Sequence, residues 1–394
     1  MNVAFVTETF PPEANGAAMT AGRLVDGLLA LGHHVELVRP RPVEAAAASA
    51  SGRREDVWVP GVPLPLYRGV RLGLPAVPQL IARWSRRRPD LVHIVTEGPL
   101  GLSALHAARR LRLPVSSGFH TNFHTYMGFY GLPWLRAAAV GYLRWFHNRT
   151  AATLVPTEQT RLDLQRAGFR NLAVVARGVD TALYAPHKRR VDLRARWGAP
   201  TGPVALVVGR LAKEKNLPLA VEAFQAMRRE RPQARLVVVG DGPLRPELQR
   251  RHPDVVFTGT LRGEELAAHY ASADVFLFPS LTETFGNVVL EAMASGLAVV
   301  AFDDAAAREH IRHADNGLVA PAPDRAAFVR TAAAAVADPG LAWRLGIEAR
   351  RTTLSIGWPE VAARFGALLA RVADGHQADP RPSRRLHAAR ASSL

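Results

Sequence analysis

The same order of elements occurs twice in the chain, once from residue 1 and again from residue 202. The first copy contains an apolar segment "MNVAFVTETF", a loop, an amphipathic segment "MTAGRLVDGLLALG" and a second apolar segment "HHVELVRP". The second copy repeats this order with "GPVALVVGR", "LAKEKN", "LPLAVEAFQAMRRERP" and "ARLVVVGDGP". Continuously apolar strands that alternate with amphipathic helices are typical of parallel sheets covered on both faces. The repeat therefore predicts an α/β chain with two Rossmann-like domains.

The segment 180–200 is polar and lacks a strand pattern, so it is expected to contain the domain boundary. The N-terminal domain is predicted over residues 1–185. The C-terminal domain is predicted over residues 186–373, with its last helix free to return to the N-terminal domain. Residues 374–394 carry almost no large apolar side chains, which predicts a disordered basic tail.

The composition excludes several classes of protein. The chain has no Cys, so disulfides and thiolate metal sites are excluded. The first residues contain no basic segment and reach Glu8 early, which indicates a first strand and not a signal peptide. No apolar run approaches the ~20 residues that span a bilayer. We expect a cytoplasmic protein whose only membrane contact is peripheral, on the inner face of the membrane.

The positive charge is concentrated in the first half of the chain. The formal net charge is +16, and residues 1–190 contribute 24 Lys and Arg against 12 Asp and Glu. Such a surface favours an anionic partner, which could be nucleic acid, an acidic membrane or a phosphorylated substrate, and a general bias toward Arg is the alternative. A nucleic-acid-binding protein should interleave basic and aromatic residues, and the low aromatic content of 7% makes that class the least favoured.

Cations follow the first strand of the second repeat. Arg210 stands at the end of "VALVVGR", and Lys213 and Lys215 follow before the next helix. Ligands of open α/β sheets bind beyond the carboxyl ends of the strands, and a helix start with nearby cations suits a phosphate. Two of the three lysines of the chain lie in this loop. It is predicted to bind phosphate, and the alternative is a solvated surface loop.

Two glutamates flank the start of another predicted helix. Glu283 precedes "FGNVVLEAMASG", and Glu291 lies in the second turn of that helix. Free backbone N–H groups are expected at about residues 285–288, where a diphosphate could rest. Glu291 would then accept hydrogen bonds from a ribose, and Glu283 from another polyol. The alternative is one ordinary surface glutamate and one helical glutamate paired with an arginine.

With these segments, the chain resembles the retaining GT-B glycosyltransferases of glycosyltransferase family 4 over about residues 1–370. "ETFGNVVLE" has the E-x7-E pattern of that family, "GRLAKEKN" its phosphate loop and "PPEANGAAMTAGRL" its N-terminal glycine loop. "GFHTNFHTYM" (118–127) and "RGVD" (177–180) are similar to a subset that includes GDP-mannose-dependent α-mannosyltransferases and sulfoquinovosyl-diacylglycerol synthases. The resemblance implies two Rossmann-like domains that face each other across a cleft. It implies that the N-terminal domain, residues 1–185, binds the acceptor and that the C-terminal domain, residues 186–373, binds the nucleotide sugar.

The resemblance also implies roles for matching residues. It assigns the reaction centre to His120, Glu283, Arg210 and Lys215. It assigns donor binding to Gly16, Arg210, Lys215, Glu283, Thr284, Phe285, Gly286, Asn287 and Glu291. It implies no bound metal and no cofactor, because a nucleotide sugar is the donor substrate and the cations and the helix dipole act on its diphosphate.

The implied reaction is the transfer of a hexose, with retention, from a nucleotide sugar to a lipid or glycan acceptor. The resemblance favours α-mannose from GDP-mannose. A nucleotide-sugar epimerase with the same two-domain architecture is an alternative. A dinucleotide oxidoreductase would need G-x-G-x-x-G after a strand, but "GDGPLRPE" (240–247) has Arg245 at the sixth position.

Two basic segments predict contact with an anionic membrane. "IARWSRRRPD" (81–90) and "YGLPWLRAAAVGYLRWFHNR" (130–149) mix cations with large apolar side chains. Cations near an anionic surface and aromatic side chains at the headgroup level would both favour binding. The alternative is that the apolar residues face the core of an ordinary helix.

Overall fold

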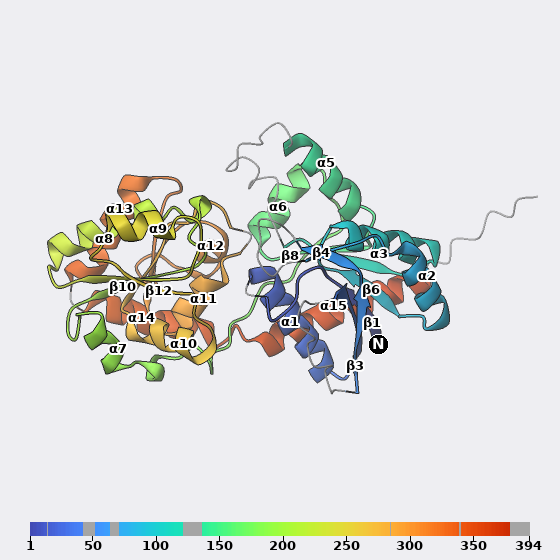
Figure 1. The fold of residues 1–394 in the computed structure, drawn as a ribbon, viewed down its shortest axis with the longest axis horizontal. Helices are drawn as coiled ribbons and strands as arrows, with labels where there is room; N and C mark the ends of the chain where they lie inside the picture. Colours follow the sequence, from blue (N-terminus) through green and yellow to red (C-terminus); the bar gives the residue numbers. More distant parts are fainter. Residues whose placement is uncertain are drawn as a thin grey trace, which may run out of the picture.

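The computed structural model describes residues 1–13, 15–41, 52–63, 71–120, 136–283, 285–338 and 340–378. The chain forms two lobes that lie side by side, each built on one parallel sheet (Figure 1). The predicted architecture of two Rossmann-like α/β domains is therefore confirmed. Among the helices of these residues, none combines the length and the apolar character that crossing a membrane requires.

The first lobe contains a seven-stranded parallel sheet. Its strands, in spatial order, are β3 (Arg54–Val59), β2 (His34–Pro40), β1 (Asn2–Val6), β6 (Leu91–Ile94), β7 (Val115–Gly118), β8 (Ala152–Val155) and β9 (Leu172–Val174). Its helices are α1 (Gly16–Ala30), α2 (Val77–Arg86), α3 (Pro99–Arg110), α5 (Arg136–His147) and α6 (Glu158–Arg166). A small antiparallel pair is formed by β4 (Gly61–Pro63) and β5 (Arg71–Gly73). The strand order reverses between β1 and β6, so the loops after these two strands diverge there.

The second lobe contains a six-stranded parallel sheet. Its strands, in spatial order, are β12 (Val256–Gly259), β11 (Arg235–Val239), β10 (Val204–Val208), β13 (Val275–Phe278), β14 (Ala298–Phe302) and β15 (Leu318–Ala320). Its α-helices are α7 (Val191–Arg196), α8 (Leu217–Glu230), α9 (Arg245–Arg251), α10 (Gly263–Ser272), α11 (Asn287–Ala294), α12 (Ala305–His310), α13 (Arg325–Ala337) and α14 (Leu341–Thr353). Two short 3-10 helices are η2 (Pro186–Lys188) and η3 (Lys213–Lys215).

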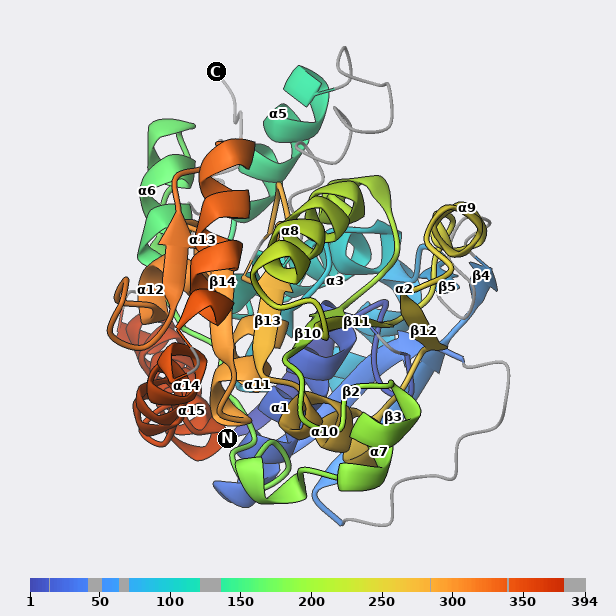
Figure 2. The ribbon, with the colours of Figure 1, turned by 90° about the vertical axis from the view of Figure 1, so that its left-hand side faces the viewer.

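Helices cover both faces of the second sheet (Figure 2). The apolar residues of α8 and α13 form one core against it, and those of α10 and α11 form the core on the opposite face. The strand order reverses between β10 and β13. The loops after β10 and β13 therefore flank the crevice in which a ligand of such a sheet binds.

The last helix, α15 (Trp358–Ala378), returns to the first lobe and lies beside α1 (Figure 1). Phe365 and Leu369 are buried in the core that also contains Phe5 and Leu28. The approach is close, because a Cβ on Gly27 would lie 2.3 Å from the Cβ of Ala362. The helix continues to Ala378, so the first residues of the expected tail are helical. Residues 379–394 lie outside the described part of the chain.

The two passages between the lobes run next to each other. The chain leaves the first lobe after β9 and re-enters it before α15. The amide of Val179 donates to the carbonyl of Ile356 at 3.0 Å, and Val179 pairs with Gly357 in a parallel bridge. Along the chain, β9 is the last strand of the first sheet and β10 is the first strand of the second. The proposed boundary between residues 185 and 186 lies between these two strands.

Candidate active site

The loop after β10 carries the two predicted phosphate cations. Arg210 follows the strand directly, and Lys215 ends η3, which leads into α8. Both side chains line a small pocket together with Phe278 and Ser280 at the end of β13. The two loops at the reversal of the strand order therefore meet at one place.

Glu214, between the two lysines, fixes this loop in place. Its side chain is 3% exposed, and its backbone carbonyl accepts hydrogen bonds from the amide of Leu281 at 3.0 Å and from Ser280 Oγ at 3.3 Å. Lys213, in contrast, is exposed. The segment is therefore anchored to the loop after β13, and the alternative of a merely solvated surface loop does not describe it.

Glu283 contacts the phosphate loop directly. Its Oε1 forms an ion pair with Lys215 Nζ and accepts a hydrogen bond from Ser280 Oγ at 2.9 Å. The side chains of Lys215 and Glu283 are 21% and 13% exposed, so water screens this pair less than it screens a surface pair. Two motifs that lie 68 residues apart in the sequence thus form one cluster.

The start of α11 offers backbone amides to this cluster. Gly286 precedes the helix and adopts the left-handed region, at φ 89°. Because glycine has no side chain, the N-cap residue leaves the first amides of α11 without a side-chain acceptor. A Cβ at this position would lie 3.2 Å from the ring of Phe278 and would be strained at that φ, so glycine is required here. Phe285 is buried, and its carbonyl accepts from the amide of Ala306 at 2.8 Å. Thr284 lies outside the described residues.

Glu291 lies in the second turn of α11, as predicted, and is half-buried. Its Oε2 accepts a hydrogen bond from the hydroxyl of Tyr270 at 2.9 Å. Burial raises the pKa of Glu291 to about 7, although the hydroxyls of Tyr270 and Tyr184 and the charge of Arg23 favour the ionised form. The alternative of an ordinary helical glutamate paired with an arginine does not describe Glu291, because its hydrogen-bond partners are tyrosines.

Gly16 is the first residue of α1, so this helix begins three residues earlier than the sequence predicted. Asn15 caps the helix by accepting a hydrogen bond from the amide of Ala18 at 2.8 Å. Gly16 is exposed, and a Cβ there would lie 3.8 Å from Nη1 of Arg177. The glycine therefore lies at the surface beside Arg177 and not in the core.

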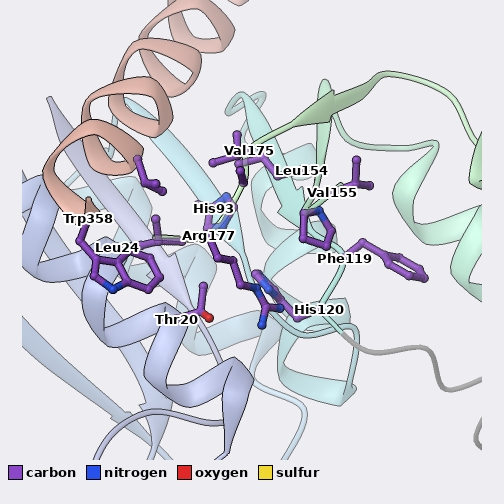
Figure 3. A pocket seen from close by; sticks show the side chains of 13 residues that line it. Thr20, Leu24, His93, Phe119, His120, Leu154, Val155, Val175, Arg177 and Trp358 are labelled. Carbon is purple, nitrogen blue, oxygen red and sulfur yellow. The ribbon is translucent and has the colours of Figure 1, made fainter. Parts of the chain in front are cut away.

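His120 follows β7 and lines a pocket of the first lobe, in which its imidazole lies beside the guanidinium of Arg177 (Figure 3). Gly118 makes room for the ring, because a Cβ there would lie 2.2 Å from Nε2. That nitrogen is buried without a hydrogen-bond partner. Burial, and next the charge of Arg177, hold the pKa of His120 well below its ordinary value, so the ring is neutral. Residues 121–127 of the same motif lie outside the described residues.

Arg177 is a site residue that the sequence analysis did not identify. It lies just beyond β9, and its Nη1 donates to Oδ1 of Asn287, the first residue of α11, at 3.2 Å. The available signal was a cation near the carboxyl end of a strand, which is the criterion that identified Arg210. The pairing with Asn287, 110 residues away, has no local signature.

The glycines of "GDGP" have a structural role. Gly240 and Gly242 adopt φ values of 137° and 159°, and a Cβ on either would lie within 2.5 Å of a backbone oxygen of the loop after β10. The amide of Leu211 donates to the carbonyl of Asp241 at 2.9 Å. These glycines let the two loops pack backbone to backbone, which accounts for the G-x-G pattern without a dinucleotide.

The two predicted membrane segments differ. Trp84 is fully buried and donates to Glu36 at 2.8 Å, and Arg83 and Arg87 form ion pairs with acidic residues, so the prediction for residues 81–90 is wrong in its aromatic anchor. In α5, Phe146 is buried, whereas Tyr142 and Trp145 are exposed. Trp134 and Leu135 lie outside the described residues.

Within the described part of the chain, no group of three or more His, Asp or Glu side chains is arranged to hold a metal ion.

The chain is similar to known proteins over most of its length. The family model "Glycosyltransferase Family 4" matches residues 14–183, and "Glycosyl transferases group 1" matches residues 202–338. A GDP-mannose-dependent alpha-mannosyltransferase of Mycolicibacterium smegmatis is 36% identical over 94% of this chain and 98% of its own length. A sulfoquinovosyl transferase of Arabidopsis thaliana is 37% identical over 61% of this chain and 48% of its own length.

A solved structure supports the fold. Sucrose-phosphate synthase from Thermosynechococcus elongatus superimposes with a TM-score of 0.79 at 21% identity, over 95% of this chain and 99% of that one. These matches confirm the predicted GT-B fold and the resemblance to the family 4 glycosyltransferases. The chain therefore belongs to glycosyltransferase family 4.

Proposed function

We propose that this enzyme transfers an α-mannosyl group from GDP-mannose, with retention of configuration, to a hydroxyl of a lipid or glycan acceptor. The name of the Mycolicibacterium smegmatis relative, which is similar over nearly its whole length, supports this donor. The observation that carries the proposal is the cluster of Lys215, Glu283 and Ser280 beside the start of α11. A transferase is preferred to an epimerase because both matching family models describe glycosyl transferases.

In this proposal the donor spans the two loops of the second lobe. The diphosphate rests on the amides at the start of α11, including those of Phe285, Gly286 and Asn287, with Arg210 and Lys215 on its other side. Thr284 is assigned to the same donor site. Glu283 accepts hydrogen bonds from hydroxyls of the donor sugar, and Glu291 accepts them from the ribose. Gly16 lets the backbone of the first lobe approach the phosphates, and His120 lies near C6 of the sugar.

The chemistry follows from where charge develops. The bond between C1 of the sugar and the phosphate oxygen breaks, and negative charge accumulates on the leaving diphosphate. In this proposal Arg210, Lys215 and the α11 amides face that charge, and donors held in place in this way stabilise a transition state electrostatically. The acceptor hydroxyl attacks the same face of the sugar and gives its proton to the leaving phosphate. The cations and the helix dipole thus supply the positive charge at the diphosphate, and we assign neither a metal ion nor a further cofactor.

We further propose that the acceptor is presented at an anionic membrane, with the enzyme peripheral on its cytoplasmic face. Tyr142 and Trp145 of α5 are exposed and stacked, and the guanidinium of Arg149 lies 4.3 Å from the centre of the Trp145 ring. The sequence of α5 contains no Asp or Glu. A helix face with aromatic side chains and only positive charge suits the headgroup region of anionic lipids.

The donor is tested by thermal unfolding of the wild-type protein with GDP-, UDP-, ADP- and TDP-sugars. A ligand that binds the native state raises the melting temperature by mass action, so GDP-mannose should produce the largest increase. Release of GDP should then depend on an added acceptor, whereas an epimerase would convert the donor without one. Stabilisation only by a sugar nucleotide with another base would contradict the proposed donor.

A further inference from the structure

We infer that Arg177 is a third cation of the donor site, and that it binds the β-phosphate of the nucleoside diphosphate from the side of the first lobe. This inference rests on the proposed function, because it takes the diphosphate to lie at the start of α11. It assigns a binding residue to the segment between the two lobes.

Arg177 is a buried cation with unused donors. The residue is 5% exposed, and its Nε and Nη2 are buried without a hydrogen-bond partner. Among the described residues, only Nη1 has a hydrogen-bond partner, which is Oδ1 of Asn287. A buried guanidinium with unmet N–H groups is costly, since the donors have lost water and gained no acceptor. A ligand that supplies oxygen atoms would remove this cost.

The charge of Arg177 is also not neutralised nearby. Within the described residues no carboxylate lies within ion-pair distance of it, and Glu283, whose charge it senses, is paired with Lys215. Burial lowers the pKa of Arg177 to about 10, so the guanidinium remains protonated at neutral pH. The neighbouring His120 is neutral and adds no counter-charge. The missing partner is therefore an anion.

The position of Arg177 identifies which anion. Its guanidinium lies 5.5 Å from the centre of the Phe285 ring, is bonded to Asn287 and faces Gly16. All three of these positions belong to the donor site proposed above, and Phe285 and Asn287 bracket the start of α11. Arg210 and Lys215 approach this helix start from the loop after β10, within the second lobe. Arg177 approaches it from the segment after β9, where it lies beside His120 (Figure 3). His120 is assigned to the sugar, so the phosphate nearest to Arg177 would be the β-phosphate, which carries that sugar.

The test compares nucleoside diphosphate and monophosphate binding by calorimetry. GDP and GMP are titrated into the wild type, Arg177→Met and Arg177→Lys. Loss of a charge-assisted contact to the β-phosphate should weaken GDP binding by about tenfold or more in Arg177→Met. GMP binding should change by less than about twofold, since GMP has no β-phosphate. Arg177→Lys should lose several-fold in GDP affinity, because an ammonium keeps the charge but not the planar fork.

Arg39→Met is the matched control. Arg39 is also a buried arginine of the first lobe, 6% exposed, but it pairs with Asp56 at 3.7 Å and lies over the ring of Trp58. Its loss should leave the ratio of GDP to GMP affinity unchanged. The same ratio in Arg177→Met as in the wild type would overturn the inference. If Arg177→Met does not fold, an unchanged ratio in Arg177→Lys overturns it equally.

These outcomes separate the inference from the proposed function. A wild type that binds UDP instead of GDP contradicts the proposed donor, and the comparison is then made with UDP and UMP. A wild type that binds GDP with an affinity independent of Arg177 leaves the donor in place and removes only the role of Arg177. A wild type that binds no nucleoside diphosphate contradicts both.

Discussion

Lys215 and Glu283 form an ion pair that joins the loop after β10 to the loop before α11. Ser280 donates to the same carboxylate oxygen, so the position of Glu283 is fixed from two sides. A donor phosphate that binds Lys215 would have to share this cation with Glu283. The pair therefore orients both groups before the donor arrives and keeps the carboxylate compensated without it.

The first prediction concerns Arg210 and Lys215. Replacing either by Met should lower turnover at least tenfold, because each lost charge-assisted bond costs about 1.5–3 kcal/mol. Lys215→Met should have the larger effect, since it also removes the cation from Glu283. Lys213→Met is the control, because Lys213 belongs to the same short helix but is exposed. Initial rates with GDP-mannose measure the effect, and near wild-type rates in both variants would remove this loop from the site.

The second prediction separates the two glutamates kinetically. Glu283→Gln should lower kcat, because Glu283 is assigned to the sugar, where charge changes in the transition state. Glu291→Gln should chiefly raise KM for the donor. The ribose is remote from the reacting bond, so contact with it stabilises the bound substrate and the transition state equally. The reverse pattern in steady-state kinetics would mean that the two roles are exchanged.

The third prediction concerns stability and pH. The pKa of Glu291 is raised from 4.5 in the unfolded chain to about 7 in the folded one. The folded state therefore holds this proton more tightly, and the contribution to stability falls as pH rises from about 4.5 to about 7. Above pH 7 the ionised Glu291 lowers the free energy of unfolding by about 3 kcal/mol at most. Glu291→Gln should unfold at a higher temperature than the wild type at pH 8, and this difference should disappear near pH 4.5.

The comparison with the wild type at each pH is essential, because burial also raises the pKa of Glu8 to about 7. Glu8 contributes the same slope to both proteins and cancels in the difference. Glu222→Gln, on the exposed surface of α8, is the control. A difference in melting temperature that does not vary with pH would contradict the assignment to Glu291.

The fold and the cluster at α11 could be predicted because their signals are local. Apolar strands, glycine stops and cations at strand ends are short patterns, and parallel sheets bring the carboxyl ends of neighbouring strands together. Arg210, Lys215, Glu283 and Glu291 all belong to such local patterns. The meeting of the loop after β13 with the loop after β10 follows from one further fact, which is that β13 lies next to β10 in the sheet.

Contacts between distant segments could not be predicted. Arg177 becomes a site residue only because the end of β9 meets the start of α11. The inward position of Trp84 could not be predicted for a similar reason. Its segment is basic, but the indole turns inward to Glu36 on β2, and one amphipathic helix does not reveal which partner its apolar side faces.

The fourth prediction concerns the two passages between the lobes. A Cβ on Gly178 would lie 2.9 Å from backbone atoms of Gly357 and Trp358, so the passages could not stay at their present distance. Gly178→Ala should lower the melting temperature and weaken GDP binding, because Arg177 is the adjacent residue. Gly141→Ala is the control, since a Cβ there meets no atom within 4 Å and alanine favours the helix by about 0.5–1 kcal/mol. Equal melting temperatures of the two variants would show that the passages tolerate separation.

The last prediction concerns the exposed face of α5. The wild type should sediment with phosphatidylglycerol vesicles at low salt, and added salt should release it, because the attraction between exposed charges is screened. The double variant Trp145→Ser, Arg149→Ser should bind less, since it removes the stacked cation and the larger of the two exposed rings. Trp343→Ser is the control, because Trp343 is 70% exposed but lies on α14 of the other lobe. Neutral phosphatidylcholine vesicles should bind neither the wild type nor the double variant strongly. If the wild type stays in the supernatant with anionic vesicles at low salt, α5 is not a membrane surface, and a soluble glycan becomes the preferred acceptor.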